Sequence, residues 1–359
     1  MSRQPHAIVP PYLLARLAAA GDERYPIAAD AARRSLVRDV PVREWRLLGE
    51  PPAFAADRQP AALPDAPSTP DRRISDAERS ETLPGRLVRR EGQAATGDDA
   101  VDDAYDGLGD THRLFDRVFG RDSIDGRGLP LEATVHYGDR YDNAFWDGER
   151  MVFGDGDGEV FTGFTGSLSV IGHELAHGVT ERTAALRYQG QSGALNEHVS
   201  DVFGALVEQY ALGQDAEAAT WLIGEGIFTD AVQGRALRSM LEPGTAYDDD
   251  VLGRDPQPAH YDDYVQTTDD NGGVHLNSGI PNRAFALAAT ELGGFAWEHV
   301  GRLWYDTLVS GRLAADTGFH RFAGETVRAA GERFGADSRE AQAVRRGWQT
   351  VGIEPEDVG

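Results

Sequence analysis

The sequence predicts an α+β fold with two lobes, in which a β-rich N-terminal lobe precedes a mainly α-helical C-terminal lobe. Between residues 74 and 165, short runs of aromatic and β-branched residues alternate with turns rich in Gly and Asp. After residue 167, one segment after another shows the spacing of apolar residues that is typical of helices. A helix expected over residues 167–183 therefore lies between the lobes, where clefts usually form.

The expected elements follow in chain order. Residues 13–20 ("LLARLAAA") predict a helix and residues 42–48 ("VREWRLL") an extended segment. The β-rich lobe should contain one helix, over residues 102–120, packed on strands such as those expected over residues 86–92 and 133–153. Beyond the helix at 167–183, further helices are expected over 193–211, 279–294, 296–311, 320–335 and 338–352.

The N-terminal region has the organisation of a removable segment. Residues 51–72 are dense in Pro, Ala and Asp without a usable period, which indicates an exposed linker. A foldable segment joined by such a linker to a large domain is typical of a propeptide, and a plain N-terminal extension is the alternative. The expected organisation is a short propeptide over 1–50, a linker or processing region over 51–72, a β-rich catalytic lobe ending in the junction helix over 73–182, and a helical catalytic lobe over 183–359.

Composition excludes several classes of function. The formal net charge of -24 argues against nucleic acid as a partner, because phosphate binding depends on Lys and Arg. The chain has no cysteine, so any metal must be held by His, Asp or Glu. Pro10, Pro11 and Arg16 interrupt the apolar N-terminal run, so no conventional signal peptide is expected. No stretch approaches the ~20 apolar residues of a membrane span, so no membrane partner is expected.

The stretch "HELAH" (173–177) carries the first chemical signal. The i, i+4 spacing places His173 and His177 on one helix face, one turn apart, so that both imidazoles can reach one ion. Glu174 projects about 100° away from His173. It is therefore expected to act as a general base on water rather than as a third ligand.

A catalytic zinc needs a third protein ligand, and Glu197 in "GALNEHVSD" is the candidate. It lies 20 residues beyond His177, on the next expected helix. The same stretch offers acceptors for the other ring nitrogens, Asp201 for His173 and Asn196 for His177. Ligands and their supporting acceptors together predict one zinc ion.

Four stretches then carry a resemblance to a known family: residues 141–158 ("YDNAFWDGERMVFGDGDG"), 173–208, 237–240 ("LRSM") and 270–285 ("DNGGVHLNSGIPNRAF"). In this order they resemble the thermolysin family of metalloendopeptidases. The segment "IVPPYLL" (8–14) resembles the short propeptide of the protealysin-type branch. The resemblance implies a zinc endopeptidase made as a zymogen, with its own propeptide and peptide or protein substrates as partners.

The resemblance also implies roles for further residues. Tyr188 and His275 are expected to stabilise the oxyanion of the tetrahedral intermediate, and Asp270 to orient His275. Asn143 and the backbone of Ala144 match the edge that pairs with the substrate main chain. Arg238 matches the arginine that contacts the carbonyl of the residue after the scissile bond. The pocket for that residue's side chain is expected to be apolar, which implies a preference for bulky hydrophobic residues; it aligns with Phe164, Val170, Ile223 and Leu237.

Calcium ions are a point of departure from the family. Three of the aligned carboxylate positions around a paired calcium site hold Ser169, Thr220 and Leu222, which leaves Glu208 and Glu225. Hydroxyl and leucine side chains do not replace carboxylates around a hard cation, so a double site is not expected, although calcium remains possible. The runs "GDGDG" (154–158) and "YDDD" (247–250) are interpreted as turns and solvated charge.

Two other functions fit parts of the pattern. A zinc aminopeptidase could use the same helix, but no acidic anchor for a substrate's amino terminus is evident. A non-catalytic binding module is disfavoured because base, ligands and oxyanion donors are all present. We expect a monomer that is secreted by a non-classical route, with a cytoplasmic location as the alternative.

Overall fold

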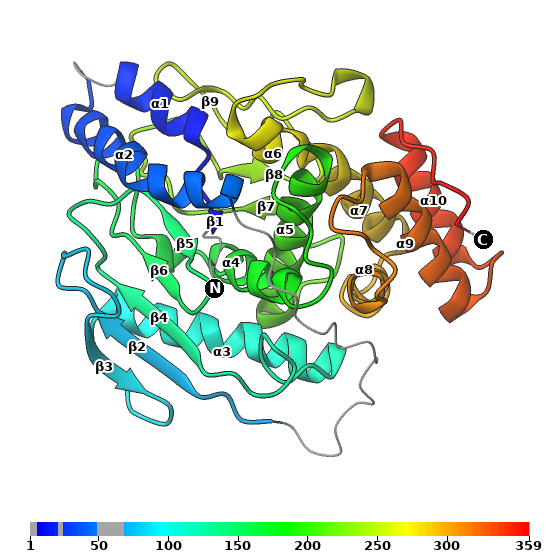
Figure 1. Cartoon of the computed structure of the whole chain (residues 1–359), viewed down its shortest axis with the longest axis horizontal. Helices are drawn as coiled ribbons and strands as arrows, with labels where there is room; N and C mark the ends of the chain where they lie inside the picture. The colour runs from blue at the N-terminus through cyan, green and yellow to red at the C-terminus, as the bar shows by residue number, and fades with distance from the viewer. Residues whose placement is uncertain (1–5, 21–23, 49–67, 359) are drawn as a thin grey trace.

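The computed structural model describes residues 6–20, 24–48 and 68–358; within these, the side chains of His6, of Ala20 and of residues 40–48 are not described. The first lobe contains a six-stranded mixed sheet with the strand order β1-β5-β6-β4-β2-β3. Its strands are β1 (His6–Ala7), β2 (Arg72–Asp76), β3 (Arg86–Arg90), β4 (Leu131–Val135), β5 (Ala144–Trp146) and β6 (Met151–Phe153). The long helix α3 (Asp99–Phe119) packs against this sheet (Figure 1).

The second lobe is mainly helical, as expected. The short 3-10 helix η1 (Phe164–Gly166) and the junction helix α4 (Leu168–Glu181) precede it, and its helices are α5 (Gly190–Leu212), α6 (Asp270–Asn277), α7 (Gly279–Leu292), α8 (Val300–Val309), α9 (Phe319–Phe334) and α10 (Arg339–Thr350). Short strand pairs, β7 (Leu222–Ile223) with β8 (Arg238–Ser239) and β9 (Asp248–Asp249) with β10 (Gly253–Arg254), and the 3-10 helix η2 (Tyr261–Asp263) interrupt the segment between α5 and α6. None of the described helices is long and apolar enough to cross a membrane.

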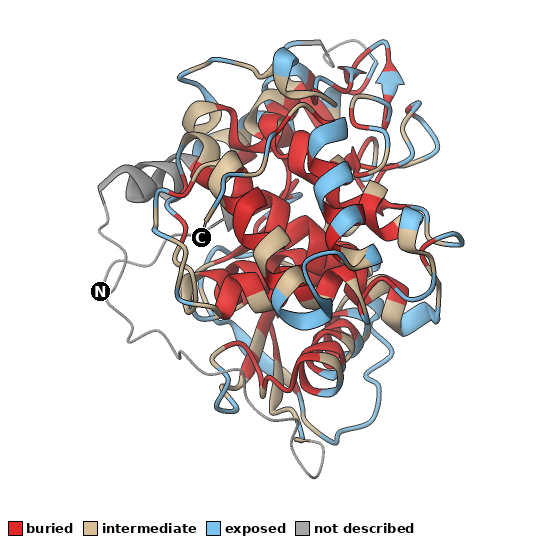
Figure 2. Ribbon diagram, turned by 90° about the vertical axis from the view of Figure 1, so that its right-hand side faces the viewer, coloured by how far each residue is buried: buried red, intermediate tan, exposed pale blue. Residues whose placement is uncertain are grey.

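Helix α4 lies between the sheet and the helical lobe (Figure 1). Nearly all of its residues are buried, because α5, α3 and strand β5 pack around it. Figure 2 shows buried residues concentrated along the central helices, with exposed residues on the outer surface. Side chains that project from α4 are therefore held rigidly in the interior.

Glycines set the distance between α4 and α5. A Cβ atom on Gly172 would lie 3.0 Å from the Cα atom of Gly204, and one on Gly204 would lie 2.4 Å from the carbonyl oxygen of Ser169. No larger residue fits at either position without moving a backbone. The two helices thus approach more closely than side chains would allow.

The N-terminal segment forms two helices that lie against both lobes (Figure 1). These are α1 (Pro11–Ala20) and α2 (Pro26–Leu48). The expectation of a helix over residues 13–20 is confirmed. The extended conformation expected for residues 42–48 is wrong, because α2 continues through them to Leu48. The helix continues past Pro41, which has no N–H to donate; the residues after it add backbone hydrogen bonds without a new nucleation cost, and this outweighs weak local preferences.

The turn around "GDGDG" is anchored by a histidine. His136 Nδ1 lies 2.7 Å from Asp155 Oδ1, and its Nε2 lies 3.1 Å from Asp98 Oδ2, the carboxylate that caps α3. The hydrogen bond to Asp155, helped by its charge and by Asp98, outweighs partial burial and raises the pKa of His136 to about 9. Asp157 in the same turn is buried and accepts backbone N–H groups, so the interpretation of this run as solvated charge is wrong for that residue.

Protonated His136 should stabilise the fold in a defined pH window. Because its folded-state pKa is above the ordinary value of 6.5, the contribution is complete below pH 6.5 and is lost as the pH rises through about 9. We expect His136→Gln to lower the free energy of unfolding by at most about 3 kcal/mol below that window, and by much less above it.

Urea unfolding on both sides of this window measures the effect. A Glu174→Ala background removes the expected general base and limits self-digestion. His320→Gln is the matched control, since the His320 ring contacts the carbonyl of Glu354 rather than a carboxylate. An equal loss of stability at all pH values in His136→Gln would contradict the assignment.

Candidate active site and metal centre

Three buried side chains converge where α4 meets α5. The potential ligand atoms of His173, His177 and Glu197 all lie within 4.8 Å of one another. The two Nε2 atoms of the histidines are 3.0 Å apart, and the carboxylate oxygens of Glu197 lie 3.4 and 3.5 Å from them. Within the described part of the chain, this is the one group of three or more such residues that could hold a metal ion.

The hydrogen bonds of the two histidines set their tautomers. Asp201 Oδ1 accepts from His173 Nδ1 at 2.8 Å, and Asn196 Oδ1 accepts from His177 Nδ1 at 2.8 Å. The Oδ1 and Nδ2 atoms of Asn196 cannot exchange positions without the loss of a hydrogen bond, because Nδ2 donates to the carbonyl of Leu186 at 3.0 Å. Both Nδ1 atoms therefore carry protons, and both Nε2 lone pairs face the cluster. The positions expected for Asp201 and Asn196 agree with this geometry.

This arrangement fits a zinc ion. Two facing lone pairs repel each other unless a cation lies between them, and Glu197 Oε2 is buried without a hydrogen-bond partner. Two imidazoles and one carboxylate are a ligand set that catalytic zinc uses, with one position open to water or substrate. The donors present thus match the metal predicted from the sequence.

Asp201 pairs with a second group that local sequence does not reveal. Arg238 donates to its carboxylate from Nε at 2.9 Å and from Nη2 at 2.8 Å, and both residues are fully buried. Burial favours the protonated acid, but the charge of Arg238 and the hydrogen bond with His173 outweigh it and hold the pKa of Asp201 far below its usual value. The carboxylate therefore stays ionised, which strengthens its hold on the His173 ring.

A chain of buried polar groups extends from Asp201 into the helical lobe. The indole of Trp304 donates to His198 Nε2 at 2.7 Å, so Nε2 is an acceptor and Nδ1 carries the proton. That proton is donated to Asn282 Oδ1 at 2.8 Å, and Asn282 Nδ2 donates to Asp201 Oδ2 at 2.8 Å. Burial lowers the pKa of His198 to about 4, which keeps the ring neutral. Sequence analysis did not identify His198 or Asn282.

His275 and Tyr188 meet on the other side of the cluster. Asp270 Oδ1 accepts from His275 Nδ1 at 2.7 Å, and Nε2 of the same ring lies 3.2 Å from the Tyr188 hydroxyl, which also donates to Glu197. Burial lowers the pKa of His275, but Asp270 and Glu197 outweigh it and raise the pKa above its ordinary value. The predicted oxyanion residues therefore lie next to the metal cluster.

A tight turn makes this contact between Asp270 and His275 possible. Asp270, Asn271, Gly272 and Gly273 all have positive φ, between 51° and 85°. This left-handed run reverses the chain so that the Asp270 carboxylate reaches both the ring and the backbone N–H of His275. Glycine adopts such a conformation with little strain, which explains the "GG" in the motif.

Glu174, the predicted general base, faces the edge of the sheet. It is buried, and its Oε2 accepts from the backbone N–H of Trp146 in β5 at 3.0 Å. This places the carboxylate between the metal cluster on α4 and the strand that was expected to pair with substrate.

That strand is already paired with residues 6–9 of the same chain. Strand β1 runs antiparallel to β5, with Ala7 opposite Phe145. The backbone of Ile8 donates to the carbonyl of Ala144 at 3.1 Å, and Val9 N–H donates to Asn143 Oδ1 at 2.9 Å. Sequence analysis predicted the edge at Asn143 and Ala144 but not the strand that occupies it.

Two predicted site residues also contact this segment. Arg238 Nη1 donates to the carbonyl of Ile8 at 3.2 Å, and His275 Nε2 lies 3.1 Å from the carbonyl oxygen of Ala7. Ile8 and Val9 are at most 1% exposed. The cleft in front of the metal cluster is thus filled by the chain's own N-terminal segment.

The four residues predicted to form an apolar pocket are all buried in the same hydrophobic core as Ile8: Phe164, Val170, Ile223 and Leu237. The backbone of Leu237 donates to the carbonyl of Ile223 at 3.0 Å, so these two lie on adjacent segments. Val170 lies on α4, one turn before His173.

The positions that align with the paired calcium site hold carboxylate, hydroxyl and apolar side chains. Burial raises the pKa of the Glu208 carboxyl, and the charge of Glu225 raises it further. A hydrogen bond from Ser169 lowers this pKa but does not cancel the rise. Leu222 is buried, whereas Thr220 is exposed. Calcium binding remains an open expectation.

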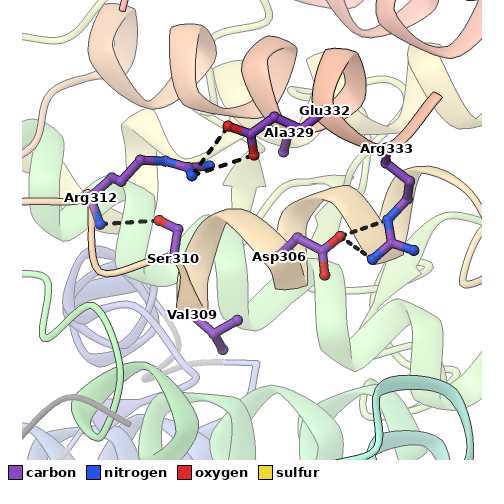
Figure 3. Close-up of a pocket in the computed structure, with 7 residues that line it drawn as sticks. All are labelled: Asp306, Val309, Ser310, Arg312, Ala329, Glu332 and Arg333. Atoms are coloured by element: carbon purple, nitrogen blue, oxygen red, sulfur yellow. Dashed lines mark hydrogen bonds and ion pairs between the residues drawn. The ribbon is translucent and has the colours of Figure 1, made fainter. Parts of the chain in front are cut away.

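A surface hollow lies apart from these residues. It has a volume of about 470 Å³ between α8 and α9, and its charged groups pair with one another: Arg312 with Glu332, and Arg333 with Asp306 (Figure 3). None of the predicted site residues lines it.

Comparison with known proteins identifies the family. The family model described as "Thermolysin metallopeptidase, catalytic domain" matches residues 63–181, and "Thermolysin metallopeptidase, alpha-helical domain" matches residues 184–353. The chain belongs to the thermolysin metallopeptidase family. It is 50% identical to an "Extracellular metalloprotease" of Pectobacterium carotovorum subsp. carotovorum, over 98% of each chain. It is 40% identical to "Thermolysin" of Alicyclobacillus acidocaldarius over 72% of this chain and 46% of that protein.

A solved structure of similar architecture supports the branch within the thermolysin family. The precursor of protealysin, a metalloproteinase from Serratia proteamaculans, matches with a TM-score of 0.86 and 50% identity, and covers 97% of this chain and 99% of its own. The expected α+β fold, the zinc metalloendopeptidase function and the protealysin-like branch made as a zymogen are confirmed.

Removing a predicted zinc ligand should remove the metal. We expect purified protein to hold about one zinc per chain, and His177→Ala or Glu197→Ala to lose most of it, because each removes a buried donor. Asp201→Ala should weaken zinc affinity by about 10–100-fold, since it removes only the acceptor that orients His173.

Metal analysis after dialysis measures this. Glu217→Ala is the control, because Glu217 is exposed and lies outside the cluster. Full zinc content in both ligand variants would show that the metal lies elsewhere.

Proposed function

We propose that this protein is the zymogen of a zinc endopeptidase whose N-terminal segment blocks its own active site. The observation that carries the proposal is the position of residues 6–9, which lie along β5 in front of His173, His177 and Glu197. A peptide strand in front of a zinc cluster is the arrangement that a peptidase needs for its substrate. The same arrangement, made within one chain, inhibits it.

The roles of the site residues follow from their positions. A zinc ion held by His173, His177 and Glu197 supplies Lewis-acid chemistry, which polarises a substrate carbonyl and lowers the pKa of water. Glu174 takes a proton from the attacking water and passes it to the leaving amine. No covalent bond between enzyme and substrate is needed.

Donors next to the cluster stabilise the charge that develops on the carbonyl oxygen. His275 and Tyr188 lie 3.2 Å apart, and Asp270 holds the His275 ring in place. Donors aimed at an oxyanion are typically worth about 10²–10³ in rate. Asp201 and Asn196 fix the orientation of the two ligating histidines.

The substrate main chain is held by three residues. Asn143 and Ala144 pair with its backbone at the sheet edge, and Arg238 donates to the carbonyl after the scissile bond. This is supported by the contacts that these residues make with Ile8 and Val9. The side chain after the scissile bond enters the apolar pocket formed by Phe164, Val170, Ile223 and Leu237.

The organisation of the chain follows the same division. Residues 1–50 form the propeptide, 51–72 the linker in which processing occurs, 73–182 the first catalytic lobe with its zinc helix, and 183–359 the second. Contacts between the propeptide and the lobes support this: Glu159 Oε2 accepts from Ile27 N–H and Ala28 N–H at the start of α2, and Tyr25 donates to the carbonyl of Ala231 at 2.6 Å. Residues 51–67 lie outside the described part of the chain.

The proposal also includes the cellular location of the enzyme. The relative from Pectobacterium carotovorum is named an extracellular metalloprotease, and we propose that this chain acts outside the cell as a monomer after export by a non-classical route. A cytoplasmic location is the alternative.

Loss of the general base should arrest processing without unfolding the protein. Glu174 is not a ligand, so Glu174→Ala should keep its zinc while hydrolysis falls by at least about 10²–10⁴. We expect this variant to accumulate as a full-length, folded, zinc-loaded precursor, whereas the wild type removes residues 1 to roughly 50–72 itself.

Intact mass and zinc content of both proteins test this in a host without proteases that cut the linker. Glu217→Ala, at an exposed position, is the control and should mature normally. Maturation of Glu174→Ala to the wild-type mass would exclude self-processing. A wild type that stays full length yet fully active would make the segment a plain extension.

The mature enzyme should cut internal bonds on the amino side of Leu, Phe or Ile. Its pocket is apolar, and each CH₂ group buried there contributes about 0.8 kcal/mol. Cleavage mapped on a denatured protein measures the preference, and a peptide with a blocked amino terminus distinguishes an endopeptidase from an aminopeptidase. A dominant preference for charged residues at this position, or no cleavage of the blocked peptide, would contradict the proposal.

A further inference from the structure

The backbone contacts of Ile8 and Val9 are complete. Ile8 donates its N–H to Ala144 and accepts from Arg238 at its carbonyl. Val9 donates its N–H to Asn143 Oδ1 and accepts from Asn143 Nδ2 at 3.4 Å. Each backbone N–H and carbonyl group of Ile8 and Val9 is therefore bonded to Asn143, Ala144 or Arg238. These three residues are the ones proposed to hold the main chain of a substrate on the carboxyl side of the scissile bond.

The carbonyl before Ile8 has different neighbours. The oxygen of Ala7 lies 3.1 Å from His275 Nε2, and that nitrogen lies 3.2 Å from the Tyr188 hydroxyl and 3.5 Å from Glu197 Oε2. Among the carbonyls of residues 7–9, this is the one that contacts His275, the predicted oxyanion donor whose ring lies next to Tyr188 and the ligand Glu197. It defines the register of the segment in the cleft.

The side chain after this carbonyl also matches a substrate. Ile8 is bulky, apolar and completely buried, and Arg238, which donates to its carbonyl, directly follows the pocket residue Leu237 in the chain. An isoleucine is one of the side chains that the pocket should accept on the carboxyl side of a cleaved bond. Backbone register and side chain thus agree.

We propose that the Ala7–Ile8 bond occupies the scissile position and that the enzyme hydrolyses it, so that the propeptide is a slow substrate of its own active site. The inference rests on the proposed function and adds a second processing site, far from the linker. Water adds its oxygen to the Ala7 carbonyl carbon, and the C–N bond to Ile8 breaks. The products are a carboxylate at Ala7 and an amine at Ile8, which takes up the proton from Glu174.

Contacts made by the rest of the propeptide explain why cleavage of this bond does not open the active site at once. Helix α1 begins at Pro11, and Leu13, Leu14 and Leu17 on it are at most 1% exposed. Arg16 donates to the carbonyl of Val251 at 3.1 Å. The new amine at Ile8 therefore stays in place after cleavage, where it hinders release and favours re-formation of the bond. A chain cut here still covers the half of the cleft beyond the scissile bond.

The experiment follows the full-length zymogen by mass spectrometry under denaturing conditions. We expect a fragment that ends at Ala7 and a partner that begins at Ile8, formed at a rate that does not depend on protein concentration, because the bond already lies in the site. Ile8→Asp should lower this cleavage at least about tenfold, since a charge does not fit the apolar pocket. Ile8→Leu should keep it, and Ala15→Asp, at an exposed position of α1, is the control.

A second measurement does not depend on catalysis. In full-length Glu174→Ala protein, the backbone N–H groups of Ile8 and Val9 should be protected from hydrogen exchange, and Ile8→Asp should remove this protection while Ala15→Asp keeps it. Unprotected amides in the parent variant would overturn the register.

The outcomes separate the two proposals. If the mature enzyme cleaves a blocked reference peptide before Leu but the zymogen never yields a fragment ending at Ala7, this inference is wrong and the proposed function stands. If neither is cleaved, the proposed function itself fails. Cleavage that slows in proportion to dilution would show that other molecules make the cut, which also contradicts the proposed position of the bond.

Discussion

The close packing of α4 on α5 is the constraint on which the rest of the site depends. Gly172 and Gly204 leave no room for a Cβ atom between the two helices, so their backbones touch. His173 follows Gly172 directly, and Glu197 lies two turns before Gly204 on the partner helix. The two-histidine face of one helix therefore meets the carboxylate of the other at ligand distance. A side chain at Gly204 would clash with the carbonyl oxygen of Ser169 and push α5, with Glu197, away from α4.

Asp201 fixes the orientation and the tautomer of the His173 ring that this packing brings to the cluster. It joins a ring on α4, a guanidinium on β8 and an amide on α7 through one buried carboxylate. Arg238 compensates its charge, which would otherwise be costly in the interior. The same arginine also reaches into the cleft, where it holds the carbonyl of Ile8. One ion pair thus joins the metal cluster to the main chain of the propeptide, and we expect a change at Arg238 to affect both.

In the proposed function, the edge of the sheet pairs first with the propeptide and later with substrate. An edge strand presents unpaired backbone groups, and β5 pairs with β1 in the zymogen. Asp39 adds to this by accepting from Tyr141 and from Asn143 at 2.6 and 3.1 Å. The propeptide thus occupies the edge and engages an amide that a substrate would use. In the proposed function, inhibition and recognition rely on the same backbone geometry.

The sequence by itself determined the features that depend on short spacings. The i, i+4 histidines, the "NEHVSD" stretch, the change from strand-like to helical patterns and the linker composition all predicted ligands, lobes and a propeptide. Local patterns did not predict contacts between distant segments, such as Arg238 with Asp201 or Asn282 with His198. Nor did they predict that residues 6–7 form a strand, because the two residues of β1 carry no periodicity and pair with β5 more than 130 positions away. Helix α2 continued through "VREWRLL" because propagation of an existing helix outweighed local preference. Only the tertiary structure decided which segment lies in the cleft, since that depends on which backbone groups the folded lobes leave unpaired.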